Sequence, residues 1–447
     1  MVKAGSSGEV KSYRNAFSVP VFPEGRPFWM LEKRKRAYAR FKDLGFPAPK
    51  DEAWRRDPLP AILDVVHLPP AGDLSLDPET IYRKALIHSG SKVFCFVNGI
   101  YDEGLTNPVT NSSALSVCNL GPMLKANEPG ILKVFGACLE EEANPFACIN
   151  TFSFEDGAFV KISKEHPSQE PIHLCFIAKG DGAIAPAIYP RIFIWLEDGA
   201  SADFVIQHLG YDDQPYFVNA VAEIFLQKGA SASVQILERG SPGTHQLCKM
   251  NFYLEEKSNL DLTIYSEGGK YSRNDSEVFF RGKDAACTLR GLSFLSGDAR
   301  VSNHLTVHHN VPRCTSRQYY KNILCERAEA EFDSLVRVCR GAVESDSNQL
   351  NRNLLLSSGA RAYARPQLQI EDENVKASHG ATTGQLEERE LFYFQSRGIS
   401  LADARYILTY GIAEEILQEM KPFEIRRELE DHVRHELKQW FDANKQS

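Results

Sequence analysis

One histidine near the C-terminal end of the chain has neighbours that suit a functional residue. His379 lies in ASHGATTG (377–384), between the acidic turn EDEN and a strongly helical ending. A neutral imidazole can bind iron or zinc, and it can also exchange a proton near neutral pH. One ligand does not make a metal site, so these residue types alone favour a turn histidine, with a catalytic base or a metal ligand as the alternatives.

Four other histidines lie at spacings that could bring their rings together. In NHLTVHHN (303–310), His304 and His308 would share one face of a strand, but the sequence offers them no third ligand and no second shell. We interpret them as histidines on the solvent face of a sheet. His432 and His435 are close together on a predicted helix, where they belong most simply to its polar face.

The motifs for nucleotide binding and acyl transfer are absent or incomplete. GDGAIA (180–185) matches the dinucleotide fingerprint G-x-G-x-x-A, but that fingerprint requires a following helix, which Pro186 and Pro190 prevent. We interpret this stretch as a glycine turn between strands. The sequence contains no G-x-x-x-x-G-K-[ST] phosphate loop and no G-x-S-x-G elbow. We therefore expect neither ATP hydrolysis by this chain itself nor a serine nucleophile.

The bulk composition is that of a globular protein and excludes several functional classes. The chain has 447 residues, of which 43% are hydrophobic, and its net charge of -8 argues against a general nucleic-acid binder. It has no apolar run of about 18 residues and no apolar N-terminal segment, so we expect neither a membrane span nor a secretory signal. The 10 cysteines include no CxxC pair, which indicates reduced, mostly buried thiols in a cytosolic protein.

The elements that must position these residues form a repeat. Each unit has a short apolar strand, a polar turn and a second, alternating strand; the units are 190–207, 221–238, 251–266, 277–294, 322–335 and 353–370. The first four turns are centred on Gly199, Gly229, Ser258 and Asp284. A nearly constant period without helices between the strands predicts a solenoid of stacked coils rather than a β-sandwich.

Alternation along the strands assigns an inner face to the solenoid. Small or apolar residues alternate with polar ones, which is the pattern of strands with one buried face. The residues expected to face the interior include Ala202, Phe204, Ile206, Leu260, Leu262, Ile264, Ala360, Ala362 and Ala364. At the end of the repeat, Ala364 should point inward while its neighbour Arg365 points outward.

Helical spacing at both ends of the chain completes the expected organisation. Residues 28–44 predict an amphipathic helix, and three helices follow the repeats, with Ser400 capping the second and Pro422 opening the third. We therefore expect a mainly β protein with three parts. These are an N-terminal helical region (1–80), a β-solenoid core (81–386, with clear repeats from about 190) and a C-terminal helical module (387–447).

The run VKASHGATTGQLEERELFYFQSRGIS (375–400) resembles the signature of the SufB/SufD family of iron–sulfur cluster assembly proteins, and SufD more than SufB. The similarity extends back through the repeats and forward into the C-terminal helices, and it includes the N-terminal helix with the DEAWR that follows it. It implies a right-handed parallel β-helix core, in agreement with the repeats.

The resemblance also implies a function. The chain would be a noncatalytic scaffold subunit of the SUF complex, with no catalytic residue and no permanently bound cofactor. It would pair with SufB through the β-helices, or with itself when isolated, and residues 387–447 would bind the SufC ATPase. It would bind neither nucleic acid nor membrane. The implied compartment is the cytoplasm, or the plastid stroma after removal of a transit peptide.

The same resemblance makes His379 a candidate metal ligand. Family members with a cysteine in this motif carry it two residues before the histidine, where this chain has Ala377. His379 would then be the ligand on this side of the SufB interface, and a SufB thiolate would complete a site for a transient cluster or iron ion.

A β-helix enzyme that acts on polysaccharide is the alternative function. Such an enzyme would need a row of carboxylates or basic residues along one solenoid face. Arg361 and Arg365 lie on one side of the last repeat, but the sequence suggests no acidic partners at matching positions in the neighbouring coils. This favours the scaffold.

Overall fold

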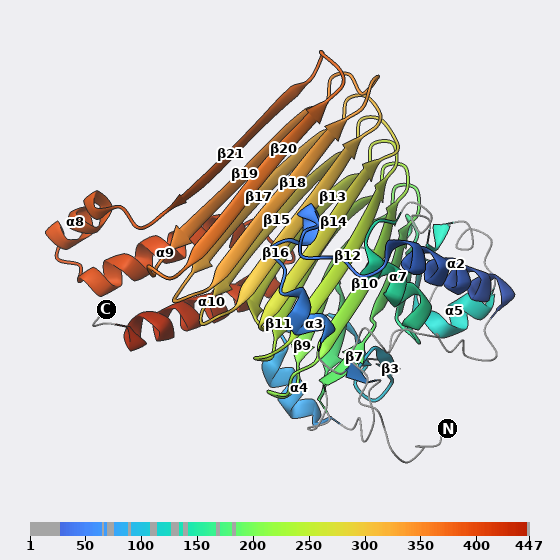
Figure 1. Cartoon of the computed structure of the whole chain (residues 1–447), viewed down its shortest axis with the longest axis horizontal. Coiled ribbons are helices and arrows are strands. Elements are labelled where there is room, and N and C mark those ends of the chain that lie inside the picture. The colour runs from blue at the N-terminus through green and yellow to red at the C-terminus, as the bar shows by residue number, and fades with distance from the viewer. Residues whose placement is uncertain are drawn as a thin grey trace.

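Two parallel β-sheets wind together into a solenoid that makes up most of the protein (Figure 1). The computed structural model describes residues 27–64, 67–68, 76–87, 91–107, 114–126, 134–136, 142–166, 170–180 and 185–444. About seven coils each contribute one strand to each sheet, so consecutive strands alternate between the sheets. The mainly β fold and the solenoid are therefore confirmed.

The strands of these coils pair in parallel register with the strands one coil earlier and one coil later. What we call the first sheet contains β8 (Arg191–Leu196), β10 (Phe217–Leu226), β12 (His245–Leu254), β14 (Tyr271–Phe280), β16 (Arg300–His309), β18 (Glu329–Val338) and β20 (Arg361–Ile370). The second sheet contains β9 (Ser201–Gly210), β11 (Ser231–Gly240), β13 (Asn259–Gly268), β15 (Ala286–Leu295), β17 (Thr315–Leu324), β19 (Asp346–Leu355) and β21 (Lys376–Gly384).

Shorter strands and several helices precede the first full coil. The strands are β1 (His67–Leu68), β2 (Lys92–Val97), β3 (Ile100–Asp102), β4 (Leu115–Asn119), β5 (Ala158–Ile162), β6 (Ile172–Ala178) and β7 (Ala185–Ile188). The helices are α2 (Phe28–Leu44), the short 3-10 helix η1 (Glu52–Trp54), α3 (Leu59–Leu63), α4 (Pro78–Lys84), α5 (Leu120–Ala126) and α7 (Pro145–Ser153). The predicted helix over residues 28–44 is confirmed by α2.

The turns inside the coils lie where the spacing predicted them. Gly199 and Gly229 have φ angles of 68° and 67°, in the left-handed region that glycine adopts without steric cost. The next two coils place Lys257 (φ 58°) and Asp284 (φ 62°) at the same point, so the third turn is centred one residue before Ser258. Each of these four coils therefore turns through one left-handed residue.

The interior of the solenoid changes character along its length. In the first coils it is apolar, and Phe204, Ile206 and Leu262 are buried there as the alternation predicted. In the later coils Gln318 and Gln349 occupy the same inward-facing column and are fully buried. Buried amides require hydrogen-bond partners, so the last coils depend on polar pairing as well as on apolar contact.

The N-terminal segment lies against the outer face of the first sheet. Trp54 of η1 is buried, and the guanidinium of Arg273 on β14 stacks on its ring at 3.7 Å. Arg273 also donates a 2.7 Å hydrogen bond to the Ala53 carbonyl oxygen. Arg365 on β20 pairs with Glu52. These contacts hold residues 52–54 against strands that come much later in the sequence.

Three C-terminal helices follow the repeats, and the last two of them cover the outer face of the second sheet (Figure 1). They are α8 (Glu388–Ser396), α9 (Leu401–Leu417) and α10 (Phe423–Ala443), with Ser400 and Pro422 at the predicted caps of the second and third. Ile416 and Leu417 are buried with apolar residues of β9, β11, β13, β15, β17 and β19. The apolar face of the second helix is thus covered largely by the solenoid itself.

Candidate functional site

The last coil leaves one end of the solenoid open. β20 and β21 are the outermost strands of their sheets, and each pairs on one side only, with β18 and β19 respectively. We call this surface, formed by residues 361–370 and 376–384, the open end. Most side chains of β21 are exposed. An exposed strand edge offers unpaired N–H and C=O groups to another chain.

His379 lies within β21 and points toward the solenoid interior. It pairs in register with Gln349, which continues the column of Gln318 and Leu289 in the preceding coils. His379 is exposed because no further coil covers it. The interpretation of His379 as a turn residue is therefore wrong, since it is a strand residue at the open end. Ala377 lies on the same face of β21 and is partly buried.

A chain of polar side chains lies beneath the open end. Gln349 Nε2 donates a 2.7 Å hydrogen bond to Ser334 Oγ, and that hydroxyl donates to Gln318 Oε1. Asn353 Nδ2 donates a 3.1 Å bond to Thr383 Oγ1 on β21. The side chains directly beneath the open end are polar, so the surface around His379 can accommodate polar or charged groups.

Ala364 occupies the inward face of β20, as predicted, but it is exposed. It pairs with Phe332, a buried core residue of β18. The interior column thus ends at Ala364 in solvent, and the expectation that this residue is enclosed is wrong.

His304 and His308 share the outer face of β16 as expected, yet neither is a solvent-facing histidine. Their side chains are 13% and 14% exposed. His308 Nε2 lies 2.8 Å from Glu277, whose carboxylate also accepts a 2.6 Å bond from Lys249. Although burial alone raises the pKa of Glu277, these two partners lower it to about 2. His304 instead faces the N-terminal segment.

The helix histidines have separate roles. His432 Nε2 lies 2.6 Å from the Glu267 carboxylate on β13, so it helps to fasten α10 to the second sheet. His435 is exposed and contacts Gln439. They do not form a joint site.

The outer face of the first sheet does carry acidic residues opposite Arg365. Asp333 pairs in register with Arg365 and accepts its guanidinium hydrogen bonds. The expectation that Arg365 has no acidic partner in a neighbouring coil is therefore wrong. Arg365 also reaches Glu52 of the N-terminal segment, so these charges bind each other and not an open groove.

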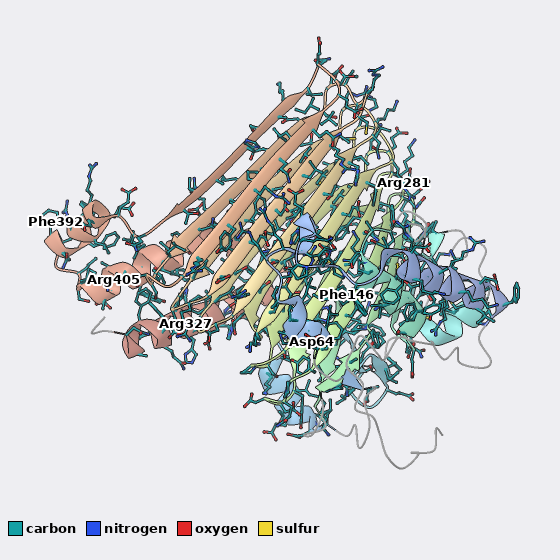
Figure 2. The ribbon with its side chains drawn as sticks, viewed as in Figure 1. Asp64, Phe146, Arg281, Arg327, Phe392 and Arg405 are labelled. Carbon is teal, nitrogen blue, oxygen red and sulfur yellow. The ribbon has the colours of Figure 1, made fainter. Side chains whose placement is uncertain are left out.

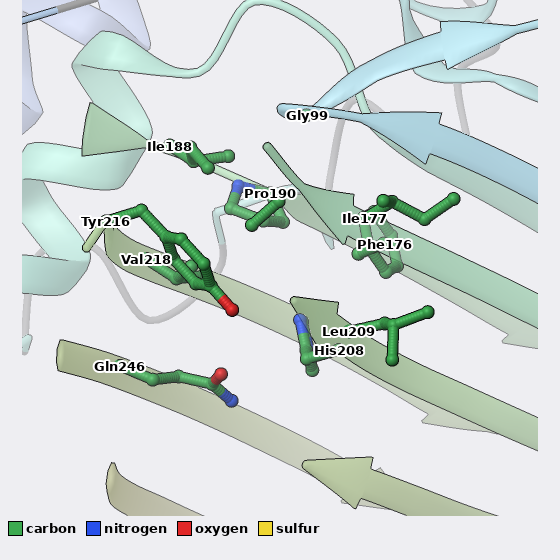
Figure 3. A pocket seen from close by; sticks show the side chains of 11 residues that line it. Gly99, Phe176, Ile177, Ile188, Pro190, His208, Leu209, Tyr216, Val218 and Gln246 are labelled. Atoms are coloured by element: carbon green, nitrogen blue, oxygen red, sulfur yellow. The ribbon is translucent and has the colours of Figure 1, made fainter. Parts of the chain in front are cut away.

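A small pocket lies among the first coils (Figure 3). His208, Tyr216 and Gln246 point into it beside the apolar side chains of Phe176 and Val218. Its volume of about 10 Å³ leaves room for about one water molecule. It is too small to be a substrate site. The GDGAIA stretch falls mostly outside the described residues.

Comparison with known proteins decides the family. Residues 176–412 match the model of the SUF system FeS cluster assembly SufBD core domain, and residues 21–174 match the model of the SufBD protein N-terminal region. The chain belongs to the SufBD family. The resemblance found in residues 375–400 is therefore confirmed, and its SufD-like character with it.

Three SufBD relatives show how far the similarity extends. An iron–sulfur cluster assembly SufBD family protein of Synechocystis is 30% identical over 399 residues, which cover 88% of this chain and 87% of the relative. The iron–sulfur cluster assembly protein SufD of Escherichia coli is 24% identical over 378 residues, with coverages of 84% and 86%. The chloroplastic protein ABCI7 of Arabidopsis thaliana is 32% identical over 296 residues, with coverages of 65% and 62%. The chain is therefore a component of SUF-system iron–sulfur cluster assembly.

The structure shows two further surfaces of this SufBD protein, the second of them within the C-terminal helical module that the sequence predicted. One is the set of ligand-type side chains around His304, which comes from distant parts of the chain. The other is α8, in which Phe392 and Tyr393 are 71% and 57% exposed. Figure 2 shows Phe392 projecting from this helix. Among the described residues, no helix is long and apolar enough to cross a membrane.

Proposed function

We propose that this chain is a noncatalytic scaffold subunit of the SUF complex, which presents His379 to a SufB partner at the open end. The observation that carries the proposal is the position of His379. It is an exposed imidazole on the outermost strand of a solenoid whose preceding coils bury the same column.

The unpaired edges of the outermost strands β20 and β21 support pairing with SufB through the open end. The β21 edge of 9 residues carries one charged side chain, whereas β20 carries Arg361 and Arg365, so β21 is the edge more prone to pair with another chain. On β21 the charged residue is Lys376, and Ile370 at the end of β20 is 42% exposed. A second β-helix with a similar end would cover both strands and the inward-facing residues between them. A homodimer of the isolated chain would use the same surface.

The SufC ATPase would bind the C-terminal module at α8 and the nearby part of α9. Every residue of α8 is at least partly exposed, and its aromatic residues Phe392 and Tyr393 face solvent. Ile407 of α9 is 40% exposed. Aromatic side chains on a protruding helix are suitable anchors in a protein interface. ATP hydrolysis would be the task of SufC, because this sequence has no phosphate loop.

His379 would act as a ligand toward the cluster or iron ion that the complex assembles. A neutral imidazole is a suitable iron ligand, and Ala377 cannot supply a thiolate beside it. The remaining ligands would come from SufB, so the cargo would be bound only in the complex. Mixed histidine and cysteine ligation would hold a nascent cluster less firmly than four thiolates, which suits its release. The complex would work in the cytoplasm, or in the plastid stroma.

Co-expression tests this assignment. The tagged full chain is produced with the SufB and SufC proteins of the same organism, and size-exclusion chromatography and mass determination follow affinity capture. We expect a stable assembly that contains all three chains, and ATPase activity only when SufC is present. Capture of neither partner would refute the scaffold role. Hydrolysis of ATP by the isolated chain would refute its noncatalytic character.

A further inference from the structure

A second group of ligand-type side chains lies on the outer face of the first sheet, where the N-terminal segment crosses it. Asp57 follows η1, His304 lies on β16, and Glu331 lies on β18. One donor atom from each residue can be chosen so that all three lie within 4.8 Å of one another. Nitrogen and carboxylate oxygen donors in this combination suit zinc or iron(II) better than magnesium or calcium, which prefer oxygen ligands alone.

The imidazole of His304 has a donor atom that the protein leaves unused. Nε2 is buried and has no hydrogen-bond partner among the described residues. It lies 3.9 Å from the Glu331 carboxylate, too far for a hydrogen bond. Two ligands of a tetrahedral zinc ion, each about 2.0–2.2 Å from it, lie about 3.3–3.6 Å apart. Nε2 and Glu331 therefore need to approach each other by only a few tenths of an ångström to share an ion. Burial and the nearby Arg273 lower the pKa of His304 to about 4, which keeps the ring neutral and able to bind a metal at neutral pH.

Polar side chains surround these ligands. The other nitrogen of His304, Nδ1, lies 3.7 Å from the Asp333 carboxylate, which is beyond hydrogen-bond distance but on the side of the ring where carboxylates orient metal-binding imidazoles. Tyr271 donates its hydroxyl to Asp57. Ser302 Oγ lies 3.4 Å from Glu331 Oε2. A second shell is therefore formed at Asp57, and a small approach of Asp333 would complete it at His304.

The net charge of the side chains around His304 is negative, which favours a divalent cation. The carboxylates are Glu52, Asp57, Asp275, Glu331 and Asp333, and the guanidinium groups that pair with them are Arg56, Arg273 and Arg365. Lys249 also lies near Asp275, but its charge is balanced by its ion pair with Glu277. Among these described residues, five carboxylates meet three guanidinium groups, so two negative charges remain.

We propose that Asp57, His304 and Glu331 bind one divalent transition-metal ion, zinc or iron(II), which fastens the N-terminal segment to the solenoid. The ion joins a residue near the start of the chain to two late strands, so it stabilises the docking of residues 51–57. Nε2 itself is buried, but the side chains of His304 and Glu331 are 13% and 14% exposed, so an ion can reach the ligands after a small side-chain movement. A water molecule supplies the fourth ligand. This site is separate from His379, and it requires neither SufB nor SufC.

Metal titration of the full-length protein tests the proposal. The background is His379→Ala, so that the open end contributes no imidazole. Chelator-treated protein is titrated with Co²⁺, whose visible absorption reports tetrahedral nitrogen and oxygen ligation, and separately with Zn²⁺ and anaerobic Fe²⁺ under equilibrium dialysis with elemental analysis. We expect one ion per chain and a melting temperature that rises with ion concentration. Because most nitrogen and oxygen sites bind zinc more tightly than iron(II), the two dissociation constants show which ions the site can hold and do not by themselves identify the native metal.

Variants distinguish this site from adventitious binding. His304→Gln and Glu331→Gln should each weaken binding at least tenfold and abolish the rise in melting temperature. His308→Gln is the matched control on the same strand, and it should bind as the parent does. Circular dichroism checks the fold, and the nearly isosteric Glu331→Gln decides the matter if His304→Gln does not fold. The proposal fails if the parent binds no stoichiometric ion, or if Glu331→Gln and His308→Gln bind equally. Loss of metal binding here with SufB and SufC still bound would leave the scaffold role intact.

Discussion

His379 lies directly beside Gln349 in the register of β21 and β19, as the last member of a column that faces the solenoid interior. Gln349 is fully buried, whereas His379 is exposed. The environments of the two positions differ because a further coil covers Gln349 and none covers His379. The end of the solenoid is therefore where an internal position becomes a surface that a partner can reach.

The first prediction concerns His379 itself. His379→Ala should keep the melting temperature within about 1–2 °C of the parent and should preserve capture of SufB and SufC, because the side chain is exposed. It should lower the yield of cluster chromophore on the reconstituted complex severalfold, measured by absorbance under anaerobic reconstitution. His435→Ala, an exposed histidine on α10, is the control and should leave the yield unchanged. Normal yield and rate in His379→Ala would leave no ligand role for this residue.

A pair of alanines on the inner face of the first sheet tests the open end. Ala330 on β18 is 1% exposed, whereas Ala364, one coil later on β20, is exposed. Ala330→Glu buries a charge without a partner and should lower the free energy of unfolding by several kcal/mol. Ala364→Glu should fold almost normally but should block capture of SufB by charge and bulk. Urea unfolding and co-purification measure the two effects. If Ala364→Glu still captured SufB at the parental level, the pairing surface would lie elsewhere.

The third prediction locates the SufC contact on α8. Phe392→Ser combined with Tyr393→Ser should reduce SufC capture at least tenfold while SufB capture persists, because both rings are exposed and support no core. Phe28→Ser, at a 76% exposed phenylalanine of α2, is the matched control and should retain SufC. Pull-down with quantified band intensities measures both. Equal SufC retention by the two proteins would show that α8 is not the contact.

A simple deletion of residues 387–447 would be a poorer test of the same contact. It would remove α9 and α10, which bury Tyr265, Leu292 and Ile323 of the second sheet. We expect the truncated chain to aggregate or to unfold more easily, because that apolar face would meet water. The contacts between helix and sheet therefore make the solenoid depend on its C-terminal module.

The fold was predictable because its signals are local. Alternation along each strand and the spacing of Gly199 and Gly229 depend only on neighbouring residues, and both predicted the coils correctly. The caps of the C-terminal helices are equally local. The exposure of Ala364 was not predictable in this way, because it depends on the absence of a further coil and not on the alternation that placed the residue inward.

The sites were less predictable than the fold because they join distant parts of the chain. His304 and His308 looked like a pair, but the structure separates their partners. His304 meets Asp57, which the sequence places in an unremarkable stretch after DEAWR. The return of the N-terminal segment across the first sheet is set by tertiary contacts such as that of Trp54 with Arg273. Neither periodicity nor motif spacing encodes this crossing.

The last prediction is a pH dependence that comes from His208, a histidine in the first coils. Its ring is 4% exposed, stacks on Phe176 with a centroid distance of 5.4 Å, and lies in the small pocket of Figure 3. Burial lowers the pKa of His208 to about 4, whereas an unfolded histidine titrates near about 6.5. As the pH falls, the unfolded chain therefore binds a proton at His208 before the folded chain does. The contribution of the neutral His208 to the free energy of unfolding is complete above pH ~6.5 and is lost progressively between pH ~6.5 and ~4.

His208→Phe should remove this proton uptake while it preserves the stacking on Phe176. Between pH 7 and pH 5 the parent should lose about 2 kcal/mol more unfolding free energy than the variant. Urea unfolding at the two pH values measures the difference. Buried acids such as Glu238, whose pKa is raised by burial, titrate in both proteins and cancel in the comparison. His435→Phe, at an exposed position, should behave as the parent does, because solvent reaches this ring in both the folded and the unfolded state. An identical pH dependence of parent and His208→Phe would mean that the ring is protonated in the folded protein or reached by solvent.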